Sequence, residues 1–215
     1  MRQINQKNSD PLPGRRPRRI VTVSGRGVRG VFPSRKSRNS AQFESLTEAT
    51  ALLVLEVAPS VTAIATQPRV FHWFDGTSQR RYTPDIAIDV GHKEGSVFLE
   101  VKDDTTFTRG STAVARLLSA NSYLRKRGHR LHVLLRSELR ANDLPARLES
   151  LLVKRPMRGP YRSGIDSSQW DPENHTQPCA EIAQQWRAAQ RECDELILRV
   201  MARGPDDLLS TYSRQ

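Results

Sequence analysis

The stretch RRYTPDIAIDVGHKEGSVFLEVKDD, residues 80–104, contains two runs of alternating residue type separated by a glycine-containing turn. Every second residue of each run is apolar, which predicts two strands that each turn one face towards a core. The apolar positions are Ile86, Ile88, Val90, Val97, Leu99 and Val101. Asp85 precedes the first run, and Glu100 and Lys102 lie on the opposite face of the second. The quoted stretch therefore predicts a hairpin that gathers charge at one end.

Antiparallel pairing of the two strands determines which charged residues meet. Residues directly opposite each other share a face, so burying both apolar sets together places Asp85 opposite Glu100 or Lys102. A shift of one residue would bury the charges instead. We therefore expect two carboxylates and one ammonium to converge at the end of a hairpin whose other face is core.

The chemistry of this group suggests phosphodiester hydrolysis. Two close carboxylates repel each other unless a cation lies between them, and hard oxygen ligands suit Mg²⁺ or Mn²⁺. Lys102 can orient or deprotonate a water molecule and offset charge that builds on a phosphate. Metal-assisted hydrolysis of a phosphodiester uses these groups. Taken alone, the same residues also fit a solvated strand face with an ordinary salt bridge.

The flanking sequence predicts an α/β fold. A helix of about four turns is expected from Ser40, with Asn39 or Ser40 as its N-cap and Pro59 at its end. Strands in SVTAIATQ and RVFHWF and a turn at Asp75-Gly76 should follow. After the hairpin, we expect a helix in STAVARLLSANSYLRKRG and a strand in LHVLLR. This order predicts an α/β sandwich on a mixed sheet flanked by helices. Glu44 and Glu48 share one face of the first helix, and one of them could complete a metal site.

Basic residues are concentrated near the N-terminus. The chain has 34 Lys and Arg and 23 Asp and Glu, and eleven of the basic residues lie in the first 40, where Asp10 is the single acid. This arm is poor in large apolar groups, so we expect it to become ordered only on a polyanion such as nucleic acid. The candidate DNA-binding residues are Arg15, Arg16, Arg18, Arg19, Arg26, Arg29, Arg35, Lys36 and Arg38. A solubility tail or a targeting run would have a similar composition.

The remaining chain predicts a helix in NDLPARLESLLV, a connector and a last helix over about 179–203 with an apolar stripe. Such a stripe packs on its own domain more often than on a partner. No apolar run reaches membrane-spanning length and no signal peptide is evident, so we expect a soluble, intracellular protein. The expected division is a basic arm over 1–38, a folded core over 39–153, a linker over 154–178 and a C-terminal helical segment over 179–215.

Several motifs occur in an order that resembles the TnsA-like transposon endonucleases, a branch of the PD-(D/E)xK nucleases with a restriction-endonuclease-like core. The resemblance covers about residues 28–138. The matching segments are VRGVFPSRKSRN, FESLTEATALLVLEVAPSV, Gln67-Pro68, RYTPDIAID, FLEVKDD and the helix followed by LHVLLRS. Several motifs in order are more specific than a single charged triad.

The resemblance implies a role for each matching residue. The helical glutamate of the catalytic group falls on Glu48, the metal-binding aspartate on Asp85, the second acid on Glu100 and the lysine on Lys102. Glu44 and Gln67 are possible accessory residues: Glu44 can equally be a surface residue, and Gln67 can contact the site or only close the sheet edge. The implied cofactor is Mg²⁺, which Mn²⁺ can replace.

The resemblance also implies partners and a cellular role. Proteins of this family cut the DNA strand at transposon ends that the transposase does not cut, together with a DDE-type transposase and an AAA+ ATPase regulator. A cytoplasmic, nucleoid-associated bacterial protein is then expected, with no membrane partner. The family's C-terminal part recruits the ATPase, but this chain's is short and contains no recognisable winged helix. A stand-alone restriction- or resolvase-type nuclease and a non-catalytic DNA-binding adaptor remain alternatives.

Overall fold

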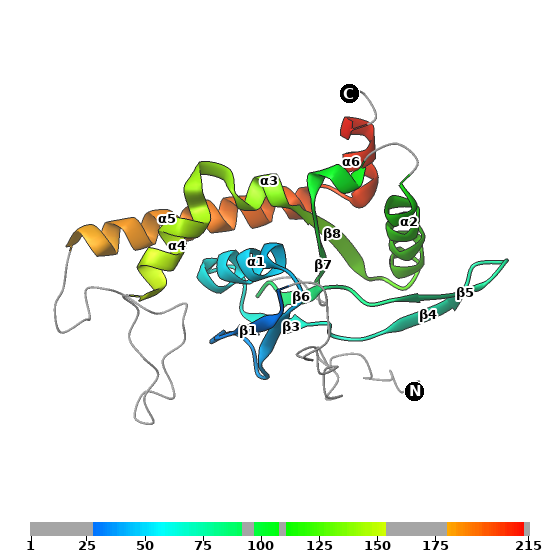
Figure 1. The fold of residues 1–215 in the computed structure, drawn as a ribbon, viewed down its shortest axis with the longest axis horizontal. Helices are drawn as coiled ribbons and strands as arrows, with labels where there is room; N and C mark the ends of the chain where they lie inside the picture. Colours follow the sequence, from blue (N-terminus) through cyan, green and yellow to red (C-terminus); the bar gives the residue numbers. More distant parts are fainter. Residues whose placement is uncertain (1–27, 92–96, 108–110, 154–179, 213–215) are drawn as a thin grey trace, which may run out of the picture.

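A four-stranded mixed sheet forms the centre of the protein in the computed structural model, which describes residues 28–91, 97–107, 111–153 and 180–212 (Figure 1). The strands are β1 Gly30–Phe32, β2 Ala41–Phe43, β3 Ala63–Thr66, β4 Phe71–Phe74, β5 Gln79–Tyr82, β6 Ile86–Asp89, β7 Val97–Lys102 and β8 Arg130–Leu135. The helices are α1 Leu46–Val57, α2 Thr112–Arg125, α3 Arg136–Leu139, α4 Leu144–Val153, α5 Ala180–Ala202 and α6 Pro205–Tyr212, with 3₁₀ turns at Asp104–Phe107 and Ala141–Asp143. The predicted α/β architecture with a mixed sheet flanked by helices is confirmed.

The central sheet has the strand order β3-β6-β7-β8. Strands β3, β6 and β7 pair antiparallel, and β8 is parallel to β7 after the crossover through α2. Ile86 lies opposite Leu99 in the β6–β7 pair, as the alternation of apolar residues predicts. Two further pairs, β1–β2 and β4–β5, form separate two-stranded sheets.

Helices cover both faces of the central sheet. Ile86, Ile88 and Leu99 face a core shared with α1, α4 and α5. Ala87 and Phe98, on the opposite face, are buried in a second core with side chains of α2 and α6. The alternative of a solvated strand face is therefore wrong, because this face too is buried.

Helix α1 begins later than predicted. Ala41–Phe43 form β2, and the helix starts at Leu46 with Ser45, not Asn39 or Ser40, as its N-cap. Ser45 Oγ accepts a hydrogen bond from the backbone N–H of Glu48 at 3.1 Å, which satisfies an otherwise unpaired donor of the first turn. The helix ends at Val57 because Ala58, which precedes Pro59, is extended, as predicted from the proline.

Residues 28–40, which precede β2, are folded onto the core, so the predicted boundary of the folded core at residue 38 lies inside an ordered segment. β1 pairs with β2, and the backbone N–H of Ile64 donates to the carbonyl of Lys36 at 3.0 Å. Lys36 itself is 7% exposed, and its Nζ donates to the carbonyls of Leu55 (2.9 Å) and Ala58 (2.5 Å). The prediction that Lys36 contacts DNA is therefore wrong, because its ammonium caps the C-terminal end of α1.

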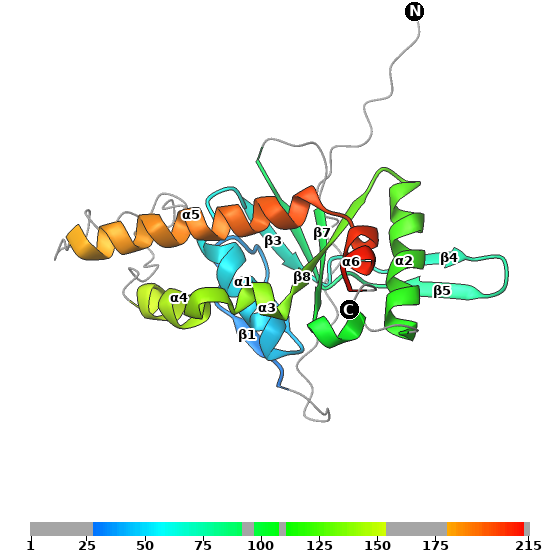
Figure 2. The same ribbon diagram turned by 90° about the horizontal axis from the view of Figure 1, so that it is seen from above.

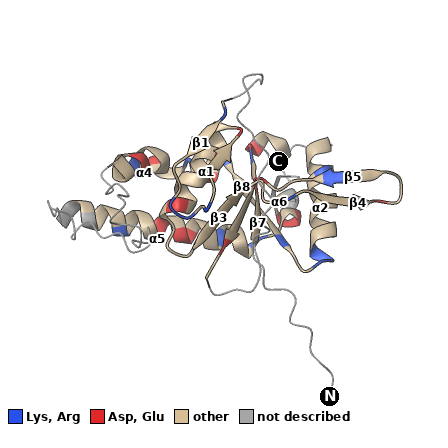
Figure 3. Ribbon diagram, turned by 90° about the horizontal axis from the view of Figure 1, so that it is seen from below, with Lys and Arg blue, Asp and Glu red and all other residues tan. Residues whose placement is uncertain are grey.

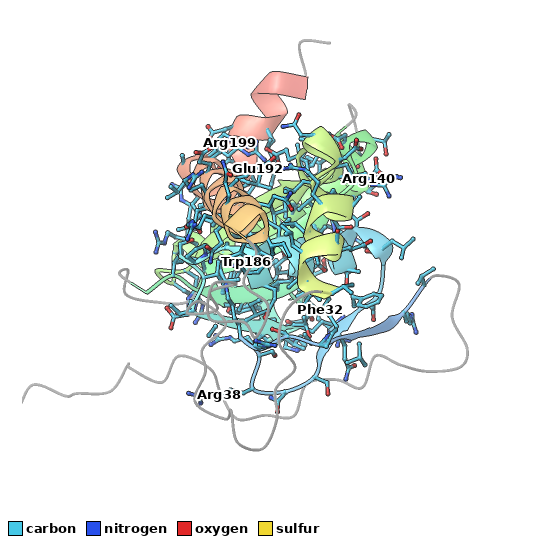
Figure 4. The ribbon with its side chains drawn as sticks, turned by 90° about the vertical axis from the view of Figure 1, so that its left-hand side faces the viewer. Phe32, Arg38, Arg140, Trp186, Glu192 and Arg199 are labelled. Carbon is cyan, nitrogen blue, oxygen red and sulfur yellow. The ribbon has the colours of Figure 1, made fainter. Side chains whose placement is uncertain are left out.

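The apolar stripe of α5 packs on the protein's own core. Trp186, Cys193 and Ile197 are buried with α1 and α4, and Figure 4 shows Trp186 on the side of α5 that faces the sheet and Arg199 on the outer side. Burial raises the pKa of the Cys193 thiol to about 12. The sequence did not predict α6, which begins at Pro205, a residue well suited to a first helical position. None of the helices described is long and apolar enough to cross a bilayer.

Replacing Lys36 with methionine tests its capping role, because methionine keeps the apolar stem and removes the ammonium. We expect the free energy of unfolding, measured by urea denaturation, to fall by about 1–3 kcal/mol, since two buried carbonyls lose a charged donor. The control is Arg38→Met, which removes the same charge from an exposed side chain and should change stability by less than about 0.5 kcal/mol. Equal effects of the two substitutions on the free energy of unfolding would contradict the capping role of Lys36.

Candidate active site

Asp85 and Glu100 meet at the end of the β6–β7 pair. Asp85 directly precedes β6, and continuing the pairing of Ile86 with Leu99 by one residue places Asp85 opposite Glu100. The Asp85 carboxylate is fixed to the neighbouring strand, because its Oδ2 accepts a hydrogen bond from the backbone N–H of Val101 at 2.8 Å. The convergence predicted from the alternating residues is therefore confirmed for this pair.

The Glu100 carboxylate is bound at both oxygens. Its Oε1 lies 2.5 Å from Lys102 Nζ, and its Oε2 accepts a hydrogen bond from the Tyr82 hydroxyl at 2.5 Å. The Glu100 side chain is 9% exposed and that of Lys102 26% exposed. This is a partly enclosed ion pair, in which the charges are screened less by water than on an open surface.

Glu48 reaches the group from the first turn of α1. Its Oε2 accepts from the backbone N–H of Glu44 at 2.8 Å, and its Oε1 accepts from Ser45 Oγ at 3.1 Å. The carboxylate is close enough to Asp85 and Lys102 to affect the pKa of each. Helix α1 therefore brings a third carboxylate to the two that the sheet supplies.

The site disfavours negative charge on its buried groups. Burial raises the pKa of Asp85 well above its usual range, and the charge of Glu100 raises it further. Burial also raises the pKa of Glu48, although hydrogen bonds from Glu44 and Ser45 oppose the shift. For Lys102, burial lowers the pKa, but the nearby carboxylates, led by Glu100, outweigh it and raise the pKa overall. Lys102 is therefore held as an ammonium.

The two accessory residues contribute through their backbones. Glu44 donates its N–H to Glu48. The N–H of Gln67 donates to the carbonyl of Asp85 at 2.8 Å, which extends the β3–β6 pairing by one residue. Gln67 has a φ of 44° immediately before Pro68, a combination that is sterically unfavourable and concentrates at functional sites. Closing the sheet edge is thus the role of Gln67 that the backbone contacts support.

Tyr82 is a site residue that the sequence did not predict. The strand carrying Asp85 was expected to begin at about that residue, and no element was predicted for Tyr82; in the structure, residues 83–85 separate β5 from β6, and the two strands belong to different sheets. Tyr82 at the end of β5 then lies beside Glu100. The signal in the sequence was an aromatic residue three positions before Asp85. Its spacing alone could not predict that Tyr82 contacts Glu100.

The predicted basic surface is described in part. Arg15, Arg16, Arg18, Arg19 and Arg26 lie outside the described residues. Arg38 is exposed, and Arg29 and Arg35 are partly exposed. A second basic group, Arg125, Lys126 and Arg127, lies at the C-terminal end of α2, and Figure 3 shows it at the same end of the molecule as the basic residues of β5.

The donor atoms suit a hard divalent cation in their chemistry. Glu48, Asp85 and Glu100 offer carboxylate oxygens, the ligands that Mg²⁺ and Mn²⁺ prefer. Within the described part of the chain, however, no three or more His, Cys, Asp or Glu residues are grouped closely enough to hold a metal ion. The side chains would have to move together to share one ion, and Lys102 and Tyr82 would have to yield oxygens of Glu100.

Replacing Asp85 with asparagine should stabilise the metal-free protein at neutral pH, since the amide oxygen can still accept from Val101 without carrying charge. Because the folded-state pKa of Asp85 is raised, the folded protein holds its proton at a pH where the unfolded chain has lost it. Wild-type stability is therefore lost as pH rises from the unfolded pKa through the folded one. Denaturation midpoints measured from acid to neutral pH should show the advantage of Asp85→Asn growing over that window.

Asp103→Asn provides the matched control for this experiment. Hydrogen bonds from Arg136 and Thr105 lower the pKa of Asp103, so its carboxylate stabilises the folded protein above the unfolded pKa, and the amide should not raise stability at neutral pH. A uniform gain for Asp85→Asn at every pH would contradict the charge argument.

Tyr82 should resist ionisation. Burial and the adjacent charge of Glu100 raise its pKa well above the usual value of 10. The chain has four tyrosines, and absorbance titration of the folded protein should show one of them remaining protonated after the exposed phenols ionise. In Tyr82→Phe this late step should disappear while the earlier steps remain. If Tyr82→Phe instead removed one of the ionisation steps at lower pH, Tyr82 would be exposed to solvent and its pKa would not be raised.

Comparisons of the sequence with known proteins found no relative of this chain. No protein-family model matches the chain, and a search of curated proteins found no match either. The resemblance to the TnsA-like endonucleases therefore depends on the motifs in the sequence, and the activity that it implies is a proposal.

Proposed function

We propose that this protein is a divalent-metal-dependent DNA endonuclease, the TnsA-like subunit of a heteromeric transposase. It cuts, at each transposon end, the strand that a DDE-type transposase leaves intact, and an AAA+ ATPase regulator controls the assembly. The observation that carries the proposal is the convergence of Asp85, Glu100 and Lys102 with Glu48 from α1, in the order that the family motif requires.

Glu48, Asp85 and Glu100 are the residues that would hold Mg²⁺ or Mn²⁺, which supplies Lewis-acid catalysis when bound. The raised pKa of Asp85 supports this assignment, because burial beside Glu100 makes its negative charge unfavourable without an added cation. Glu48 is oriented by its bonds to Glu44 and Ser45, so its oxygens are held at a defined position.

Lys102 contributes charge rather than basicity. Its pKa is raised overall by the surrounding carboxylates, so at neutral pH it carries a proton and cannot accept one from water. Its ammonium can orient the attacking water by hydrogen bonding and stabilise charge that develops on the phosphate. Positioning the water is therefore the role of Lys102 that its surroundings favour.

A non-catalytic DNA-binding adaptor is the second candidate. The observation that favours it is the engagement of both Glu100 oxygens by Lys102 and Tyr82, with no three carboxylates grouped for a metal among the described residues. The arrangement leaves Glu100 available to an ion only after its present partners move.

Calorimetric titration of Mn²⁺, with nicking of transposon-end DNA scored in parallel with and without the cognate transposase, tests the proposal. Wild type should bind the ion and nick DNA, and Asp85→Ala should weaken ion binding by at least about tenfold because a direct ligand is lost. Lys102→Ala should retain ion binding and lose nicking. Glu149→Ala, which removes an exposed acid on α4, should behave as wild type.

The outcomes separate the candidates. Ion binding that depends on Asp85, with nicking only when the transposase is present, supports a partner-dependent nuclease. Nicking by the isolated protein without a transposase indicates a stand-alone nuclease. DNA binding without ion binding or nicking under either condition supports the adaptor and contradicts the proposal.

A further inference from the structure

Strands β4 and β5 form a two-stranded ribbon that projects from the body of the protein past α2 (Figures 1 and 2). The turn at its tip is well defined. Asp75 Oδ1 accepts hydrogen bonds from the backbone N–H groups of Thr77 and Ser78, both at 2.9 Å, and the Asp75 carboxylate pairs with Arg80. Gly76 has a φ of 97°, a conformation that favours glycine. The ribbon is thus an ordered projection.

One face of the ribbon is anchored to the protein. Phe71 pairs with Tyr82 and Trp73 with Arg80, so these four side chains share a face. Phe71 is buried in the second core, and the Trp73 ring stacks on Tyr123 of α2 with centroids 4.8 Å apart. The aromatic contacts fix the base of the ribbon against α2.

The other face has no partner among the described residues that would explain its composition. His72 lies opposite Arg81, and Phe74 lies opposite Gln79. All four side chains are exposed, Phe74 by 62%, and none is acidic. A single exposed aromatic ring is common on free surfaces, but here it lies with an arginine, a glutamine and a histidine on one face of an ordered ribbon that projects from the body, a shape suited to contact with another molecule. We call this set, His72, Phe74, Gln79 and Arg81, the outer ribbon face.

Charge and position favour nucleic acid as the occupant. The outer ribbon face is cationic, and further cations flank its base: Arg69 lies over the Phe71 ring at 4.3 Å, and Arg127 over the Tyr123 ring at 4.7 Å. Arginine is well matched to phosphate and to guanine, glutamine to adenine, and an apolar side chain to the thymine methyl group. A duplex major groove about 12 Å wide admits a two-stranded β-ribbon.

We propose that the outer ribbon face enters a groove of the DNA duplex and contacts base edges, while the flanking arginines hold the phosphates on either side. The inference rests on the proposed function for its partner and adds the element that sets the position of the DNA. β5 ends at Tyr82, whose hydroxyl is bonded to Glu100, so the base of the ribbon adjoins the candidate active site. A base sequence bound by the ribbon would thereby determine which phosphodiester lies beside Asp85 and Glu100.

Photo-crosslinking of the full-length protein tests the placement directly. Benzoylphenylalanine replaces Phe74 in one variant and Leu198 of α5, which is 60% exposed, in the control. With a labelled mixed-sequence duplex, the Phe74 variant should form a covalent adduct that maps to a base, and the Leu198 variant should not. Equal adducts from both variants, or none from Phe74 while the duplex is bound, would overturn the inference.

Binding affinity provides the second arm. Arg81→Ala should weaken binding of the duplex by about tenfold, the effect of losing one base or phosphate contact. Arg80→Ala is the matched control, because it removes the same charge from the adjacent residue, which lies on the anchored face and pairs with Asp75. It should change affinity by less than about threefold. Equal losses would show that only overall charge matters and would overturn the ribbon assignment.

The result for the wild-type protein separates this inference from the proposed function. Failure of the wild type to bind any duplex contradicts both. Binding and metal-dependent nicking that are unaffected by Arg81→Ala, with no adduct at Phe74, contradict the ribbon assignment and leave the nuclease proposal standing.

Discussion

The register of β6 on β7 is the constraint on which the site depends. Both faces of this strand pair are buried, one under α1, α4 and α5 and the other under α2 and α6. A one-residue slip of either strand would move its charged residues into the core under α1, α4 and α5, which makes the alternative register unfavourable. Pairing of Ile86 with Leu99 then necessarily brings Asp85 beside Glu100. The packing that fixes this register would stabilise the fold even without the carboxylates. The pairing of Asp85 with Glu100 is thus a consequence of that packing.

A buried carboxylate pair is unfavourable by itself, and the surrounding groups reduce that cost. Val101 donates its N–H to Asp85, and Tyr82 and Lys102 donate to Glu100. The third carboxylate depends on the position of α1, whose C-terminal end is held by Lys36 and whose last turn is tied to the N-terminal segment through Glu56 and Ser34. Contacts at the far end of α1 therefore help to set the position of Glu48, which is a reason to regard residues 34–36 as part of the support of the candidate site.

The local parts of this arrangement could be predicted from the sequence, and the parts that depend on tertiary structure could not. Alternation of period two was sufficient to predict the strands and the meeting of Asp85 with Glu100 or Lys102, and the register of the structure selects Glu100. The start of α1 was misplaced because Phe43 and Leu46 fit a helical period, although Ser45 and Glu48 form a capping signal. Lys36 could not be distinguished from its basic neighbours by charge, and Tyr82 reaches Glu100 only because the chain changes sheets at Pro84.

In the proposed function, electrostatics would separate DNA binding from cleavage. With all four groups ionised, the cluster of Glu48, Asp85, Glu100 and Lys102 holds three carboxylates and one ammonium, so its net charge is negative, and it stays negative if Asp85 alone is protonated. A phosphate is repelled by such a cluster at close range. In the proposed function, attraction would come from the arginines around it, on the outer ribbon face and at the end of α2, whose field reaches further at low salt. On the proposed function, a duplex would be held over the site before the charges within it permit reaction, and added positive charge among the carboxylates would bring the phosphate into contact.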